Sequence, residues 1–219
     1  MVALAATAEL AFAVSLAEER PLGPSLSGEA ALARSASRGD RAAFGRLVDL
    51  HKRAVHGLCY RILRDAEEAR DAAQETFVRA FSALDAYDPA QPFAPWVLRI
   101  ARNHCLDVVR RRLPGGRPVE LDADAAGDAP PQELPDLTAV RADDALVLRE
   151  TAASLARAVD GLPSNYRQVI HLFHVEHLSY KEIAVALDVP IGTVMTWLHR
   201  ARARLRASLE QDGTEEALP

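Results

Sequence analysis

Three histidines stand three residues apart in the stretch HLFHVEH, as His171, His174 and His177. Imidazole nitrogens are common zinc ligands, so the spacing raises the question of a metal site. At about 100° per residue of an α-helix, His171 and His174 lie about 60° apart but His171 and His177 about 120° apart, so one ion would not face all three. The two cysteines, Cys59 and Cys105, lie far away and lack CxxC spacing. We therefore expect a structural role for the histidines, and neither a bound metal nor a cofactor.

Two pairs of residues, Cys105 beside His104 and Cys59 near His56, contain the groups of a thiol nucleophile and its base. Adjacent residues on a helix point about 100° apart, and neither pair is accompanied by a Gly-rich elbow or an orienting carboxylate. The sequence therefore favours a protein that is not an enzyme and has no catalytic residues. Because the cysteines form no disulfide framework, we expect a reduced, cytoplasmic protein.

The residues that follow the histidines predict a helix-turn-helix. Ser179 and Glu182 fit a capping box that starts a short helix, and residues 188–191 break it before a longer helix from about Thr193. The longer helix has an apolar stripe of Val194, Leu198, Ala201 and Leu205, opposed by Thr196, His199, Arg200, Ala203 and Arg206, with Met195 and Arg202 at one flank. The alternative is that HRARARLR is merely a solvated basic face. The cap, the turn and the stripe together favour DNA binding by the second helix.

Composition and charge place these motifs in a helical protein with two basic parts. About half of the 219 residues are apolar, and hairpin dipeptides such as Asn-Gly are missing, so we predict an all-α protein. The net charge of −5 argues against a nucleic-acid binder until it is divided along the chain. Residues 41–112 carry +4, residues 113–150 carry −6 and residues 151–210 carry +2. The basic charge therefore belongs to two blocks, and most of the acid to the segment between them.

The segment between the blocks has the composition of a linker. Residues 113–137 contain five prolines, three glycines and six carboxylates against one arginine, too little apolar surface to offset the entropy of ordering. We predict two small helical domains, and divide the chain into an N-terminal extension (1–28), a first domain (29–112), a flexible acidic linker (113–141), a second domain (142–210) and a C-terminal tail (211–219). No positive charge precedes the first apolar run and Glu9 interrupts it, which favours a frayed or disordered extension, or a misplaced start codon, over a secretion signal.

Three helices are expected in the first domain. Asp40 is a suitable N-cap for the first, and the second should run from Asp65 to about Leu84. Three prolines then forbid a continuous helix, so residues 85–95 should form a loop before the third helix, WVLRIARNHCLDVVRRR. On this third helix the apolar side holds Val97, Ile100, Ala101, Cys105, Val108 and Val109, and the other side holds Arg99, Arg102 and Arg110.

Aromatic residues gather where the predicted loop meets this arginine-rich helix. Tyr87, Phe93 and Trp96 lie there, and aromatic faces beside a cationic helix suit unstacked single-stranded bases. The alternative is that Phe93 and Trp96 belong to the core at a loop-to-helix junction, and for Trp96 the core is favoured.

Taken in order, these features resemble an RNA polymerase sigma factor of the extracytoplasmic-function type, group IV of the sigma-70 family, which keeps only the second and fourth sigma regions. The resemblance runs from about Glu29 to Leu209. It is carried by GDRAAFGRLVDLH (39–51), DAAQETFVRAF (71–81), FAPWVLRIARNHCLDVVRRR (93–112) and LPSNYRQVIHLFHVEHLSYKEIAVALDVPIGTVMTWLHRARARL (162–205), with the acidic linker between them. Helix-turn-helix units occur in many regulators, but the ordered set is specific.

The resemblance implies a promoter-specificity subunit that binds the core polymerase at its β′ clamp helices and β flap. The residues implied in core binding are Asp71, Gln74, Glu75 and Phe77. Those implied at the −10 element, with a flipped non-template base, are Tyr87, Asp88, Phe93, Trp96, Arg99, Arg102, Asn103, Arg110, Arg111 and Arg112. Those implied at the −35 element are Thr193, Met195, Thr196, His199, Arg200, Arg202 and Arg206. Met195 and Trp197 stand where many relatives carry basic residues, which leaves the −35 sequence open.

The resemblance also implies an anti-sigma protein that holds the two domains in a closed, silent arrangement, and no direct insertion into a membrane. The acidic linker would thread the basic channels of the polymerase, because its carboxylates imitate a polyanion. A competing hypothesis is a regulator of double-stranded DNA in which only residues 162–206 touch DNA and the first block senses a signal. Glu75→Arg separates the two hypotheses, because only a sigma factor would lose binding to core polymerase.

Overall fold

The computed structural model describes residues 26–112 and 154–215 of the chain. The described elements are α2 (Leu26–Ala36), α3 (Arg41–Leu63), α4 (Ala66–Ser82), the 3₁₀ turn η1 (Leu84–Ala86), α5 (Phe93–Arg112), a helical stretch at 154–160, α7 (Ser164–Ile170), η2 (His171–Val175), α8 (Tyr180–Leu187) and α9 (Ile191–Glu215). No strand occurs within these two ranges, which confirms the all-α prediction. The predicted linker at 113–141 and most of the predicted extension at 1–28 lie outside the described residues.

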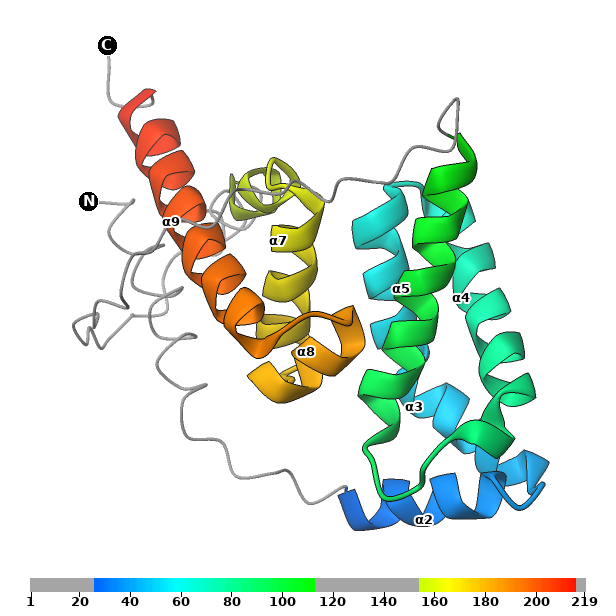
Figure 1. Cartoon of the computed structure of the whole chain (residues 1–219). Helices are drawn as coiled ribbons and strands as arrows, with labels where there is room; N and C mark the ends of the chain where they lie inside the picture. Colours follow the sequence, from blue (N-terminus) through cyan, green and yellow to red (C-terminus); the bar gives the residue numbers. More distant parts are fainter. Residues whose placement is uncertain (1–25, 113–153, 216–219) are drawn as a thin grey trace, which may run out of the picture.

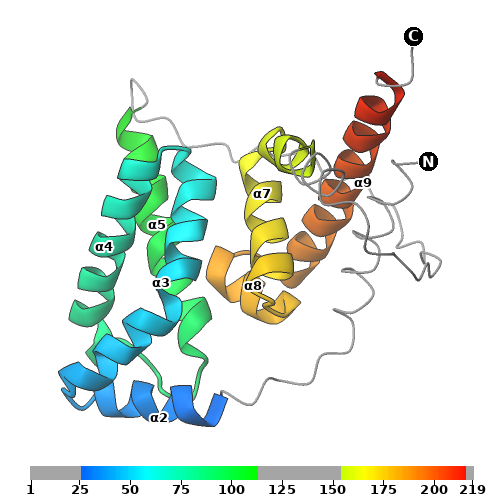
Figure 2. The ribbon, with the colours of Figure 1, turned by 180° about the vertical axis from the view of Figure 1, so that it is seen from behind.

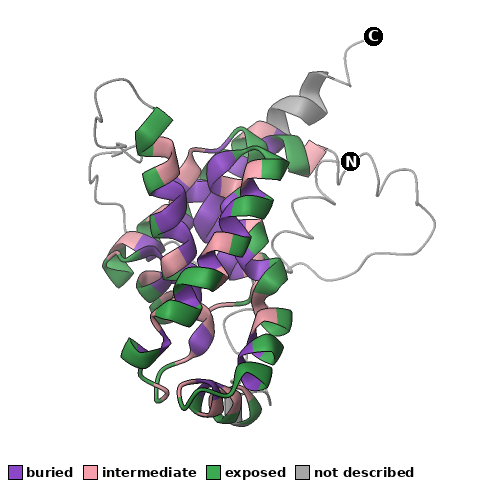
Figure 3. Cartoon of the chain, turned by 90° about the vertical axis from the view of Figure 1, so that its right-hand side faces the viewer, coloured by how far each residue is buried: buried purple, intermediate pink, exposed green. Residues whose placement is uncertain are grey.

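The first half of the molecule is a helical bundle. In Figures 1 and 2, α3, α4 and α5 run alongside one another and α2 lies across one end of them. Figure 3 shows the buried residues on the inner sides of these helices, and they include Leu47, Leu58, Val97, Leu98 and Ala101. Burying one leucine contributes about 1.5–3 kcal/mol, so this interior is what holds the bundle together.

The predicted starts of the first two long helices are confirmed by their caps. Asp40 precedes α3, and its Oδ1 accepts hydrogen bonds from the backbone amides of Ala42 and Ala43, at 2.9 and 3.1 Å. Asp65 precedes α4, and its Oδ1 accepts from the amide of Glu68 at 2.9 Å. Both carboxylates satisfy amides that have no partner inside the helix, as the sequence indicated.

The third long helix begins earlier than predicted. α5 starts at Phe93, so the loop ends at residue 92 and Pro95 lies in the first helical turn, where a missing amide hydrogen costs nothing. Glu29 of α2 accepts hydrogen bonds from the backbone of Phe93 and Ala94, and its Oε1 lies 3.3 Å from Nε2 of His51. Burial opposes the charge on Glu29, but these partners outweigh it and hold the pKa of Glu29 below its ordinary value. A residue far away in the sequence therefore caps α5.

The second half of the molecule is the predicted helix-turn-helix and its support. The stripe of α9 is buried as expected at Val194, Leu198, Ala201 and Leu205. The helix begins at Ile191 rather than near Thr193, because the carbonyl of Pro190 already accepts from the amides of Thr193 and Val194. No described helix is long and apolar enough to cross a membrane.

The capping box that the sequence predicts before α8 is present. The amide of Ser179 donates to Oε2 of Glu182 at 2.8 Å, and Oγ of Ser179 accepts from the amide of Glu182 at 3.3 Å. Asp188 ends the helix in the left-handed conformation, with φ of 50°. These local bonds fix both ends of α8 and so the direction in which the chain enters α9.

The stretch HLFHVEH does not continue α7 as an α-helix. It forms a single π-helical turn, η2, in which the amide of Glu176 donates to the carbonyl of His171, five residues back, at 3.1 Å. His177 then ends the turn with φ of 54°. The predicted angles between the histidines assumed an α-helix throughout, and they do not hold beyond residue 170.

Ser179→Ala tests the capping box. The change leaves the amide of Glu182 without its side-chain partner, and we expect the free energy of unfolding to fall by about 1 kcal/mol. Thermal and urea melts followed by circular dichroism measure this loss. Ser82→Ala is the control, because Ser82 is exposed in the last turn of α4 and its hydroxyl donates to the carbonyl of Val78 instead of capping an amide. It should be neutral or slightly stabilising; an equal loss in both variants would contradict the cap's role.

Candidate nucleic-acid interface

One face of α4 is open to solvent and carries both polar and apolar side chains. Asp71 and Gln74 are exposed on it, and Glu75 pairs with Arg79, with 2.8 Å between Oε1 and Nε. The hydrogen bond from Arg79 holds the pKa of Glu75 below its ordinary value. Phe77, the fourth residue implied in core binding, is only half-buried and packs against the core.

Two apolar residues of the same face were not singled out from the sequence. Val78 is 61% exposed and Phe81 44% exposed, and both share an arc of about 80° with Asp71 and Gln74. The sequence does contain a signal for them. Val78 follows Asp71 by seven residues and Phe81 follows Gln74 by seven, and this spacing places the apolar side chains on the same helical face as the polar ones. Phe81 is steadied by an edge contact with Phe44, whose ring centroid lies 5.1 Å away.

The aromatic residues beside the loop form a cluster with one another. The ring centroids of Tyr87, Phe93 and Trp96 lie 4.8 to 5.5 Å apart, and Tyr87 and Phe93 are buried. The hydroxyl of Tyr87 donates to the carbonyl of Gln91, and burial raises the pKa of Tyr87 to about 12. In this conformation the rings of Tyr87 and Phe93 offer no open face to a base. The cluster instead braces the loop, on which Asp88 is exposed and accepts from the amide of Ala90 at 2.9 Å.

Most of the polar residues predicted on α5 are open to solvent, but one is not. Arg99, Asn103 and the run Arg110, Arg111 and Arg112 are exposed. Arg102 was predicted on the polar side of the helix, yet it is only 7% exposed, because α8 packs on that side of α5. Burial lowers the pKa of Arg102, and the nearby charge of Asp188 opposes that effect. Arg99 lines a shallow pocket at the same junction, with Val185, Asp188 and Pro190.

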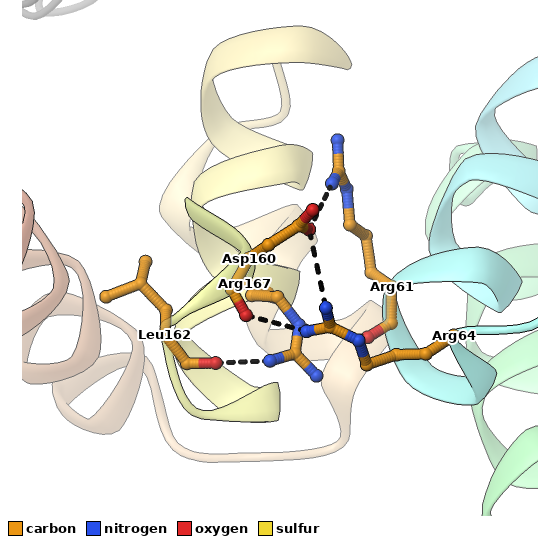
Figure 4. A network of polar contacts seen from close by, with 5 residues as sticks. All are labelled: Arg61, Arg64, Asp160, Leu162 and Arg167. Atoms are coloured by element: carbon orange, nitrogen blue, oxygen red, sulfur yellow. Dashed lines mark hydrogen bonds and ion pairs between the residues drawn. The ribbon is translucent and has the colours of Figure 1, made fainter. Parts of the chain in front are cut away.

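The two halves of the molecule are joined by a polar network between α3 and the start of α7, drawn in Figure 4. The carboxylate of Asp160 lies 3.7 Å from Arg61 and 4.0 Å from Arg64, and Arg64 also donates to the carbonyl of Asp160 at 2.6 Å. Arg167 is buried and donates to the carbonyls of Arg61, at 3.3 Å, and Leu162. Arg167 thereby bonds to the backbone of both halves.

His171 fills the centre of this junction. A Cβ atom on Gly57 of α3 would lie 2.5 Å from Nε2 of His171, so the imidazole occupies space that only a glycine leaves. Burial, together with the charge of Arg61, lowers the pKa of His171 to about 4. Glu176 lies 3.3 Å from Nε2, but burial raises its own pKa and its charge does not outweigh the burial of the ring. The imidazole is therefore neutral at neutral pH.

The other two histidines of the stretch face different surroundings. His174 is half-buried, with Arg202 and His177 near enough to add to the effect of burial, and its pKa is lowered to about 4. His177 is exposed at the end of the turn. Across residues 26–112 and 154–215, no group of three or more His, Cys, Asp and Glu side chains is placed to hold a metal ion.

The outer side of α9 carries most of the residues predicted for DNA. Met195, Thr196, His199 and Arg206 are exposed, while Thr193 and Arg200 are half-buried. The side chain of Arg202 packs against its own domain, and its guanidinium lies 5.2 Å from the ring centroid of Phe173. Trp197 packs against the core, so this position faces inward rather than toward a groove.

Comparisons with known proteins match both halves of the chain. A family model described as Sigma-70 region 2 matches residues 47–113, and one described as Sigma-70, region 4 matches residues 152–205. The ECF RNA polymerase sigma factor SigW of Bacillus subtilis is 37% identical over 178 residues, which span 80% of this chain and 94% of SigW. The ECF sigma factor SigE of Mycolicibacterium smegmatis is 37% identical over 183 residues, 82% of this chain and 67% of SigE.

A solved structure is also similar. CnrH, in complex with the cytosolic domain of CnrY, has a TM-score of 0.58 to this chain and 29% sequence identity, covering 84% of this chain and 98% of CnrH. The sigma factor RpoE of Bartonella quintana, in complex with NepR, has the same fold with a TM-score of 0.55 at 22% identity, covering 76% of this chain and 96% of RpoE.

Gly57→Leu should part the two halves of the molecule. A side chain at this position collides with His171, and overpacking of this kind costs about 1–3 kcal/mol, which favours opening by about 5- to 150-fold. Small-angle X-ray scattering should show a larger radius of gyration with unchanged helicity. Gly45→Leu is the matched control, because a Cβ there meets nothing within 4 Å. An equal expansion in both variants would contradict the contact.

Acid should open the same junction. The pKa of His171 is about 4 when buried and should return to about 6.5 when the halves separate, so the closed form binds fewer protons. The stability that the neutral imidazole gives the closed form is therefore fully present above about pH 6.5 and is lost as the pH falls toward 4. Scattering between pH 7 and 4.5 should show the expansion, with circular dichroism as a check on folding, since His174 makes the second half acid-sensitive too. His177→Gln should keep this pH dependence, and His171→Gln should weaken it.

Proposed function

The chain belongs to the extracytoplasmic-function sigma factors of the sigma-70 family, and from that membership we propose how its surfaces divide the work. Its first half binds core RNA polymerase through α4 and reads the −10 element through the loop and α5. Its second half reads the −35 element through α9. The observation that carries this assignment is that the exposed faces of α4 and α9 lie in the two segments that match sigma regions 2 and 4, in the family's order. The protein selects promoters in the cytoplasm and itself makes or breaks no bond.

Core binding is assigned to the outer face of α4. Asp71, Gln74 and Glu75 supply polar partners for the β′ clamp helices, and Val78 and Phe81 supply exposed apolar area. Apolar side chains grouped on one helical face of a protein mark a surface for a protein partner. Phe77 supports this face from behind, because it packs against the core. The β flap is the contact assigned to the second half.

Recognition of the −10 element is assigned to the loop and to the exposed arginines of α5. Extruding a base from the stack costs a few kcal/mol, and a pocket that binds it both helps melting and selects sequence. The cluster of Tyr87, Phe93 and Trp96 shapes the loop, on which Asp88 is available to a base edge. Arg99, Asn103 and the run Arg110, Arg111 and Arg112 hold the phosphates of the single strand.

Recognition of the −35 element is assigned to α9, lying in the major groove. Thr193, Met195, Thr196, His199 and Arg200 are the side chains assigned to base edges, and Arg206 contacts phosphates. Arg202 acts on the phosphates only if it leaves the ring of Phe173, so its role in this assignment is secondary.

The closed arrangement is assigned to the silent state. Arg102, one of the residues assigned to the −10 strand, is covered by α8, so the halves must part before it can meet DNA. CnrH is similar to this chain and was solved with the cytosolic domain of CnrY. By that likeness an anti-sigma protein holds this chain closed, and core polymerase competes with it.

Run-off transcription tests the proposed function. Purified chain and core polymerase, given fragments of the host genome, should initiate at a limited set of positions that share two promoter elements. Neither component should do so alone. Failure to initiate at any promoter would contradict the proposal.

Charge changes on α4 test the assigned surface. Glu75→Arg and Val78→Asp should weaken binding to core polymerase by about 10- to 100-fold, the size of a hot-spot change, in pull-down or fluorescence titration. Leu50→Asp is the matched control, because Leu50 is 55% exposed on α3 and has no assigned contact. Unchanged binding by Glu75→Arg would instead favour a regulator that touches only double-stranded DNA.

A further inference from the structure

The first two turns of α9 have an unusual outer surface for a helix that enters DNA. Residues 191–198, IGTVMTWL, include no charged and no amide side chain. Val194 and Leu198 are buried and Trp197 packs against the core. The large side chains left outside are Ile191, 43% exposed, and Met195, 49% exposed. The large side chains that the first two turns of this helix present to a partner are therefore apolar.

Ile191 and Met195 form one continuous apolar strip. They stand four residues apart in a helix, so their side chains lie one above the other on the same face. His199 continues this row one turn further on and is exposed. Thr196, beside the strip, donates its hydroxyl hydrogen to the carbonyl of Gly192 at 2.9 Å, which leaves its methyl group and oxygen lone pairs for a partner.

The chemistry of the major groove limits what such a strip can recognise. Guanine is read by the paired donors of Arg or Lys, and adenine by the amide of Asn or Gln. None of these side chains occurs in the first two turns. Thymine differs, because its C5-methyl group projects into the groove and is read by apolar contact. The strip matches this one feature of the four bases.

We propose that Met195, with Ile191 beside it, reads the C5-methyl group of a thymine in the −35 element. The proposal rests on the proposed function, since it requires that α9 meet the −35 duplex. Met195 thereby determines specificity at a position where a basic residue would select guanine, and His199 is placed to bond the neighbouring base pair. Methionine in place of a basic residue at position 195 therefore changes which base is recognised, while the contact between this position and the base pair is kept.

Replacing thymine by deoxyuridine isolates the methyl group, because uracil keeps the pairing and removes only that carbon. A promoter found by run-off mapping is built with each −35 thymine of either strand replaced in turn, and initiation by the reconstituted holoenzyme is measured. With the unchanged protein, one position should lose about fourfold, the effect of one buried methyl group. Loss at no position, while specific initiation persists, would overturn the inference and leave the proposed function standing.

Variants at position 195 assign the effect to Met195. Met195→Ala should initiate less well and no longer distinguish uracil from thymine at that position, whereas Met195→Leu should keep the distinction. Met195→Lys should move the preference at that base pair from thymine toward guanine. Val175→Ala is the matched control, because Val175 is 57% exposed in the same half of the chain but lies in η2. It should keep the full uracil effect.

The outcomes separate the inference from the proposed function. An unchanged uracil effect in Met195→Ala, with its fold confirmed by circular dichroism, would overturn the role of Met195 alone. Absence of initiation at every promoter, with the unchanged protein, would overturn both. A fourfold loss that disappears in Met195→Ala but persists in Met195→Leu and Val175→Ala would support both.

Discussion

The two halves of this sigma factor meet around one close packing contact, between the imidazole of His171 and the backbone at Gly57. An imidazole can approach the backbone of α3 so closely only because Gly57 has no side chain. Around that contact Arg61 and Arg64 bind Asp160, Arg167 bonds to the backbone of both halves, and α8 packs on α5.

The ion pairs of the junction make it a weak contact between the two halves. The side chains of Arg61, Arg64 and Asp160 are 29–48% exposed, and exposed ion pairs contribute little, about 0–1 kcal/mol each. Contacts of this kind between domains resemble transient interfaces between proteins. Arg102, Arg167 and His171 are deeply covered at this junction.

Local chemistry made much of the fold predictable, and long-range packing explains the rest. Asp40, Asp65 and the pair Ser179 and Glu182 cap helices with neighbours a few residues away, so their roles can be read from the sequence. The burial of Arg102 depends on α8, more than 70 residues further along the chain, and no periodicity reports it. The inward turn of Tyr87 and Phe93 likewise follows from the bundle around them. The assigned contacts with polymerase and promoter depend on partners and stay predictions.

The π-helical turn at His171–Val175 also matters for engineering. It holds one residue more than the regular helix would, so the point at which the chain leaves this helix, at His177, lies about 100° further round the axis of α7. Chimeric sigma factors that exchange the promoter-reading half of one protein for that of another must therefore carry this turn whole. A splice inside it would leave both parents' helices intact yet change the direction in which the chain leaves α7 and enters α8.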